Sequence, residues 1–120
     1  MKRLVNAAKD TVILESLRVC STFSGRLRGF ACQKKPHCQT GMFFPVTRRV
    51  HTFGMFFPLD LYFFNGLMEF LGKKIKVLPR SFPKSLPRTR HILEIPYSGI
   101  LLPLDLEIGD RIVILEEETL

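Results

Sequence analysis

Four residues that could bind a ligand lie in the most apolar part of the chain. His51, Thr52, Met55 and Asp60 stand among phenylalanines, seven of which fall between residues 43 and 64. An unpaired buried polar group costs about 1–3 kcal/mol, so something must satisfy the polar members of this set. Two interpretations are open: the groups pair with backbone atoms inside the protein, or they line a cleft and meet a ligand. The second interpretation makes the four residues a candidate ligand-binding site.

The spacing of these residues does not define a catalytic centre. No serine or cysteine nucleophile is placed beside His51 and Asp60, which favours a non-catalytic binding module over a hydrolase or metal-dependent enzyme that would use the two. Cys32, His37 and Cys38 are close in sequence, but structural zinc sites usually pair their ligands two to four residues apart. We therefore predict neither a metal site nor a cofactor.

Arg26 is a further candidate ligand-binding residue. It lies in the one segment predicted to be helical, near residues 22–30, which Gly29 would end. Its guanidinium could hold a carboxylate such as Asp60 or Asp110 and fix the helix to a sheet, or it could bind an anionic ligand.

The charge of the chain is divided between two regions. A net charge of +7 comes from 18 Lys and Arg against 11 carboxylates. Residues 16–93 carry fourteen cations and two carboxylates, whereas residues 94–120 carry seven carboxylates and one arginine. The basic region fits an acidic partner, sequence-independent nucleic-acid binding, or a plain solvated surface. Since no RNP, KH or zinc-finger pattern is present, the nucleic-acid hypothesis rests on charge alone.

The phenylalanines come as adjacent doublets, at residues 43–44, 56–57 and 63–64. One member of each pair can face a core while the other faces outward, because side chains alternate along a strand. An exposed set would form a patch for a partner, a second subunit or RNA, whereas a sheet covered on both faces would bury all of them. A monomer and a homodimer are both compatible with this pattern.

The elements that must position these residues are mostly strands. Alternating or aromatic segments bounded by Gly and Pro predict strands over 11–20 (with a slip at Glu15-Ser16), 43–44, 50–56, 59–64, 75–78, 92–95 and 111–115. Asn65-Gly66 predicts a two-residue hairpin of type I′. The proline-rich stretch 78–88 predicts an extended, exposed loop. Together these predict a compact, mainly β protein, a β-sandwich or jelly-roll-like barrel with one short helix.

Length and composition limit the organisation of the chain. With 120 residues, 46% hydrophobic and 24% charged, it has room for one globular domain, which we assign to residues 11–120 after a flexible N-terminal arm over residues 1–10. No apolar run approaches the roughly 20 residues that cross a bilayer, so no membrane partner is expected. Three cysteines leave at least one free thiol in a monomer, and the apolar stretch near the start is too short for a signal peptide. We predict a cytoplasmic protein.

Several segments resemble the DUF192 family. The central signature of that family, I-H-T-F-G-M-x-F-P-I-D, is matched by Val50-His51-Thr52-Phe53-Gly54-Met55-x-Phe57-Pro58-Leu59-Asp60. Weaker matches flank it in the same order, at Thr22-Phe23-x-x-Arg26, Gly41-Met42-Phe43-Phe44, Leu93-Glu94-Ile95-Pro96 and Gly109-Asp110-Arg111. The resemblance implies a compact, mainly β fold of jelly-roll type with a short helix. It implies no particular activity, since none is settled for the family.

Overall fold

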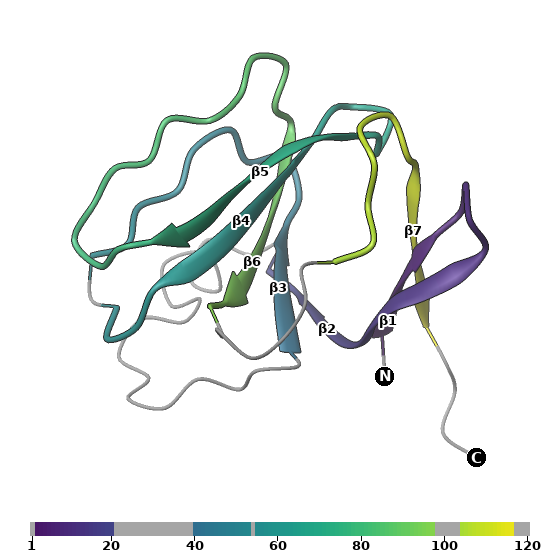
Figure 1. Cartoon of the computed structure of the whole chain (residues 1–120), viewed down its shortest axis with the longest axis horizontal. Helices are drawn as coiled ribbons and strands as arrows, with labels where there is room; N and C mark the ends of the chain where they lie inside the picture. Colours follow the sequence, from purple (N-terminus) through teal and green to yellow (C-terminus); the bar gives the residue numbers. More distant parts are fainter. Residues whose placement is uncertain (1, 21–39, 54, 98–103, 117–120) are drawn as a thin grey trace.

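The computed structural model describes residues 2–20, 40–53, 55–97 and 104–116. Seven strands make up its regular structure (Figure 1), namely β1 (Lys2–Asn6), β2 (Thr11–Val19), β3 (Thr40–Phe44), β4 (Leu59–Phe64), β5 (Phe70–Val77), β6 (His91–Pro96) and β7 (Ile112–Glu116). Six of these strands contain or overlap a segment whose apolar pattern predicts a strand, and β1 is the addition.

The strands form one sheet in the order β5-β4-β6-β3-β2-β1-β7. Only β2 and β3 pair in parallel, and every other neighbouring pair is antiparallel. The two outer strands approach each other at one end, where Phe70 N–H donates to Asp110 O at 2.8 Å and Ile112 N–H donates to Met68 O at 3.0 Å. The sheet therefore curls far enough for its edges to share backbone hydrogen bonds.

The prediction of a compact, mainly β protein is confirmed. The radius of gyration of 13.4 Å is close to that expected for a folded domain of this length. The described residues form a single sheet, and the two packed sheets of a sandwich are not seen among them. The helix predicted near residues 22–30 lies outside the described residues.

Apolar side chains fill two cores, one on each face of the middle of the sheet. Alternate residues of β4 divide between them, with Tyr62 and Phe64 in the first core and Leu61 and Phe63 in the second. The first core takes a buried residue from every strand, whereas the second takes its fully buried strand residues from β3, β4 and β6, with Leu71 and Val77 of β5 partly buried against it. Loop residues including Met55, Phe57 and Leu86 complete the second core. The middle strands are thus covered on both faces.

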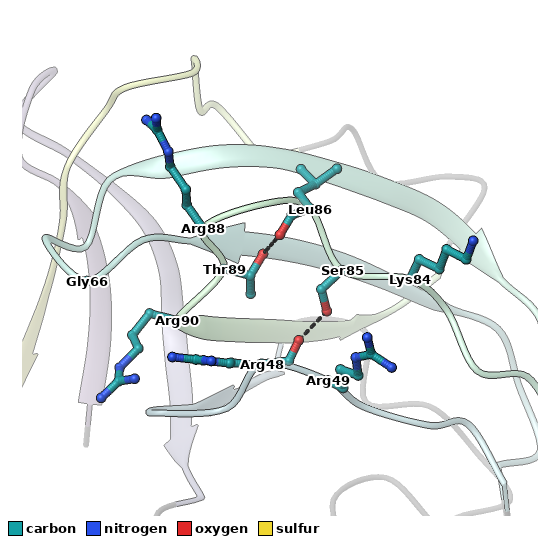
Figure 2. A pocket seen from close by; sticks show the side chains of 9 residues that line it. All are labelled: Arg48, Arg49, Gly66, Lys84, Ser85, Leu86, Arg88, Thr89 and Arg90. Carbon is teal, nitrogen blue, oxygen red and sulfur yellow. Dashed lines mark hydrogen bonds between the residues drawn. The ribbon is translucent and has the colours of Figure 1, made fainter.

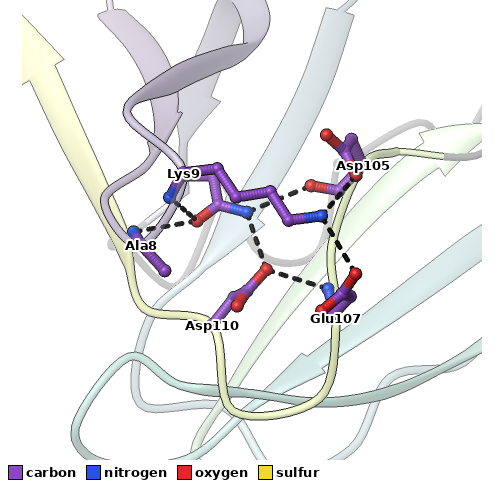
Figure 3. Close-up of polar contacts among 6 residues, drawn as sticks. Ala8, Lys9, Asp105, Glu107 and Asp110 are labelled. Atoms are coloured by element: carbon purple, nitrogen blue, oxygen red, sulfur yellow. Dashed lines mark hydrogen bonds and ion pairs between the residues drawn. The ribbon is translucent and has the colours of Figure 1, made fainter.

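The predicted flexible arm over residues 1–10 is wrong, because residues 2–6 form β1 between β2 and β7. Leu4 and Asn6 are both 0% exposed. The Asn6 amide donates to the Asp110 carboxylate at 2.8 Å and to the Asp105 carbonyl at 3.1 Å, while its Oδ1 accepts the Ala8 and Lys9 amides (Figure 3). Polar residues near the chain start thus dock by hydrogen bonds that their own sequence does not reveal.

One strand prediction and one turn prediction are also corrected. Residues 50–56 form no strand in the described part of this segment. The hairpin at Asn65-Gly66 is present but longer than two residues: Met68 N–H donates to Asn65 O, and Met68 rather than Asn65 takes the positive φ, at 64°. The Asn65 carboxamide caps this turn by accepting the Leu67 and Glu69 amides. A side chain that mimics backbone hydrogen bonding has set the length of the turn.

Candidate functional site

Thr52 joins two loops that follow different strands, residues 45–58 and residues 78–90. Its hydroxyl donates to Leu78 O at 2.7 Å and accepts the Ser81 amide at 2.8 Å, and its own amide donates to Ser81 O at 3.0 Å. The side chain is fully buried. Thr52 is therefore satisfied within the protein, and it fixes the two loops side by side.

The two loops run antiparallel beyond Thr52. Thr47 N–H donates to Arg90 O at 2.8 Å, and the Ser85 hydroxyl donates to Arg48 O. Figure 1 shows both loops on the opposite side of the view from the two ends of the chain. We call this unit, residues 45–58 with 78–90, the loop pair.

His51 lies at one end of the loop pair, in an exposed aromatic cluster. Its ring centroid is 5.8 Å from that of Phe53 and 6.3 Å from that of Phe82, and the two phenylalanine rings are 4.7 Å apart. Phe53 is 43% exposed and Phe82 is 75% exposed. His51 Nδ1 accepts the Phe53 amide at 3.3 Å. The imidazole thus faces rings and solvent rather than a carboxylate.

Asp60 and Met55 have surroundings different from those of His51. Asp60 sits on β4, where its Oδ1 accepts the Lys76 amide of β5 at 2.9 Å. Burial raises the pKa of this carboxyl, although the Lys76 amide opposes the shift. Met55 is buried in the second core. Of the polar candidates, Thr52 and Asp60 pair internally, whereas His51 lies in the exposed aromatic cluster, so the predicted residues have different surroundings.

Arg26, and the cysteines and histidine for which a metal site was not predicted, lie beyond what the structure describes. Arg26 falls in residues 21–39, as do Cys32, His37 and Cys38. Within the described ranges, no three His, Cys, Asp or Glu side chains cluster as metal ligands.

A groove of about 720 Å³ opens at the other end of the loop pair. Five cations line it, two from the first loop and three from the second (Figure 2): Arg48, Arg49, Lys84, Arg88 and Arg90. Gly66, Ser85, Leu86 and Thr89 complete its lining, so no carboxylate is among the described residues around it. All five cationic side chains are exposed. Five cations that line one groove without a described counter-charge among them create a positive potential that attracts anions.

Hydrogen bonds hold the cationic walls in place. The Thr89 hydroxyl donates to Leu86 O at 2.6 Å, which closes the turn that carries Arg88. Val46 N–H donates to His91 Nδ1 at 3.0 Å, and the His91 ring stacks on Phe43 of the first core. Because Nδ1 accepts this bond, His91 must be unprotonated there, and burial lowers its pKa accordingly. The groove is thus preformed by the loops and anchored to the sheet.

Glu94 carries a buried carboxyl group and was not among the site residues predicted from the sequence. It is 4% exposed, and its neighbours in the register, Met42 and Leu61, both belong to the second core. No described residue donates a hydrogen bond to it, and burial raises its pKa to about 8. Glu94 in turn helps to raise the pKa of the nearby Cys20 thiol, for which burial is the main cause. One acid in an otherwise apolar strand was the signal available in the sequence.

The fold and the comparisons with known proteins define the class. The molecule is a small, curled, mixed β-sheet protein. The DUF192 family model, described as an uncharacterized ACR, matches residues 4–114. The chain belongs to the DUF192 family. No curated protein sequence matches it.

Two crystal structures share the fold. A protein of unknown function from Novosphingobium aromaticivorans is 16% identical, with a TM-score of 0.72 over 93% of this chain and 82% of that one. A protein from Sinorhizobium meliloti, described as a candidate transcription regulator, is 20% identical, with a TM-score of 0.72 over 93% of this chain and 90% of that one. At these identities the likeness concerns the fold alone. Among the described residues, no helix is long and apolar enough to span a membrane.

Proposed function

We propose that the protein is a non-catalytic binding module for an acidic partner, and that the cationic groove of the loop pair is its binding site. The observation that carries this proposal is that five exposed cations line one groove without a carboxylate among its described lining residues. Cations that only keep a protein soluble are usually interspersed with acids. In this chain, seven of the eleven carboxylates lie in residues 94–120, outside the two loops that carry the groove cations.

A cleft built from His51, Thr52 and Asp60 has less support than the groove. Thr52 and Asp60 already hold internal partners and therefore need no ligand to satisfy them. His51 remains available at the aromatic end of the loop pair. The same internal pairing argues against a hydrolase that would use His51 with Asp60. The buried free thiol of Cys20 fits a module that works in the reducing cytoplasm.

The proposal is tested by calorimetric titration with inorganic polyphosphate at 50 and 200 mM salt. The natural protein should bind at low salt and lose affinity steeply as salt rises, because each charge contact releases or displaces small ions. An Arg48→Ala/Arg88→Ala variant should bind at least about tenfold more weakly, with the slope of log K against log salt reduced by about 2.

Arg18→Ala is the matched control. Arg18 is an exposed cation of the same basic region, but it lies on β2 and does not line the groove. Its removal should leave most of the affinity and the salt slope intact. Equal losses in the double variant and in the control would show that affinity follows net charge and not the groove, and an absence of binding at 50 mM salt would refute the proposal outright.

A further inference from the structure

The loop pair carries a second feature that a purely electrostatic site does not need. The rings of Phe53 and Phe82 protrude from it, although large apolar side chains normally gain free energy by burial. Each ring directly follows one of the two residues, Thr52 and Ser81, that tie the loops together. The ring pair is therefore held in place by hydrogen bonds of buried Thr52 and is not a feature of loose loops.

The rings and the groove are neighbours along the same two segments. Arg48 precedes Thr52 by four residues on one loop, and Ser85 follows Ser81 by four on the other, with Ser85 bonded to Arg48. Four residues of extended chain cover at most roughly 13 Å. A few nucleotides of an extended single strand bridge such a distance.

We infer that the acidic partner is a single-stranded nucleic acid, whose phosphates lie in the cationic groove and whose unpaired bases stack on Phe53 and Phe82. This rests on the proposed function and names its substrate class. Base-on-aromatic stacking beside a positive groove is how proteins bind single strands without sequence preference. A duplex hides the faces of its bases, so only an unpaired strand can use both features.

The charge around the rings argues for a nucleic acid over a second copy of this chain. Exposed aromatic rings could also pack in a homodimer. Two copies meeting through this surface would bring their two sets of five arginines and lysines together, and such juxtaposition of like charges opposes association. A polyanion instead gains from both the rings and the cations.

The test uses fluorescence anisotropy with three labelled probes of twelve units, namely oligo-dT, an abasic DNA strand and a DNA duplex. The abasic strand has the backbone charge of oligo-dT but nothing to stack. The natural protein should bind oligo-dT about tenfold more tightly than the abasic strand, the gain expected from at least one stacked base. In a Phe53→Ala/Phe82→Ala variant the two single strands should bind equally, both like the abasic strand on the natural protein.

Phe56→Ala is the control for the ring deletions. Phe56 is 60% exposed on the same loop but makes no ring contact with a described residue, so its removal should preserve the tenfold preference. Both deleted rings are solvent-exposed, and an unchanged unfolding curve shows that the variant is folded.

The outcomes separate this inference from the proposal beneath it. Equal binding of oligo-dT and abasic strand by the natural protein, or a preference that survives loss of both rings, would overturn the inference and leave anion binding in the groove intact. So would a duplex that binds as tightly as oligo-dT. Failure of all three probes and of polyphosphate to bind at 50 mM salt would overturn both.

Discussion

Two regions of the molecule differ in how their polar side chains are paired. At the corner where Asn6 and Lys9 meet residues 104–110, polar side chains are paired: Asn6 makes four hydrogen bonds, and the Lys9 ammonium lies 2.7 Å from Asp105 and 3.4 Å from Glu107 (Figure 3). On the side of β3, β4, β6 and the loop pair, Glu94 has no described hydrogen-bond donor and five cations have no described carboxylate. Charged side chains thus pair with one another in the first region, whereas Glu94 and the groove cations have no partner of opposite charge among the described residues.

This difference separates what holds the fold from what is free to bind. Paired groups contribute to the native state, and their removal leaves a partner unsatisfied. Unpaired charges contribute nothing to folding, and a buried unpaired carboxyl opposes it. The contrast therefore predicts opposite signs for substitutions on the two sides.

The largest expected effect comes from Glu94. Its carboxyl has a pKa near 4.5 when unfolded and about 8 when folded. Because the pKa is higher in the native state, the unfolded state loses the Glu94 proton first as pH rises. The free energy of unfolding therefore decreases between pH 4.5 and pH 8. Glu94→Gln removes this loss, and the variant should exceed the natural protein by roughly 4 kcal/mol at pH 8 and match it at pH 4. Urea unfolding at the two pH values measures the difference.

Glu15→Gln is the control for that experiment, because Glu15 is exposed and pairs with Arg3 at the surface of β2. Its stability should stay close to that of the natural protein at both pH values. Parallel pH curves for the natural protein and Glu94→Gln would show that Glu94 is solvated or paired, and the contrast between the two sides would not hold.

In the paired corner at residues 104–110, the substitution Asn6→Ala should destabilise the protein. The change leaves the Ala8 and Lys9 amides without their acceptor and removes two donated bonds, at a cost of about 2–3 kcal/mol. Thermal or urea unfolding at pH 7 gives the value. Unchanged stability would mean that water replaces the Asn6 carboxamide and that the corner does not anchor β1.

The smallest effect concerns His91, where the loop pair meets the sheet. Burial lowers the pKa of His91, with a further contribution from Arg90, so its stabilising bond to the Val46 amide is present above pH 6.5 and is lost as pH falls through the native pKa. In the Glu94→Gln background, stability should fall by no more than about 1 kcal/mol between pH 7 and 5. The Val46 amide resonance should shift over the same range, and a resonance that stays constant would disprove the assignment.

Local sequence patterns predicted most strands, but they did not predict the side-chain hydrogen bonds that connect loops and distant segments. Alternation placed β2, and the slip at Glu15-Ser16 is the register shift seen between β1 and β2. Residues 50–56 look equally strand-like, yet Thr52 directs its hydrogen bonds into the loop of residues 78–90. The two acceptors of the Asn6 amide group lie about a hundred residues away, so its burial could not be read from neighbouring residues.

The positive charge of the candidate site could be predicted from the sequence, but its position in the fold could not. The excess of cations in residues 16–93 is plain from composition. Arg48 and Arg88 become neighbours only because the loops pair through Thr47, Thr52 and Ser85. Side-chain hydrogen bonds of this kind leave no periodic trace in a sequence.

The neighbouring positions of β1 and β7 have a consequence for how the chain folds. Lys2 pairs with Glu116, so the first described strand gains its second neighbour only from the last. During synthesis β1 is complete long before β7 leaves the ribosome, and closure of a loop that spans nearly the whole chain must precede that pairing. We expect slow, late completion of the sheet, with the outer edge of β1 uncovered until then and open to strand exchange between nascent chains.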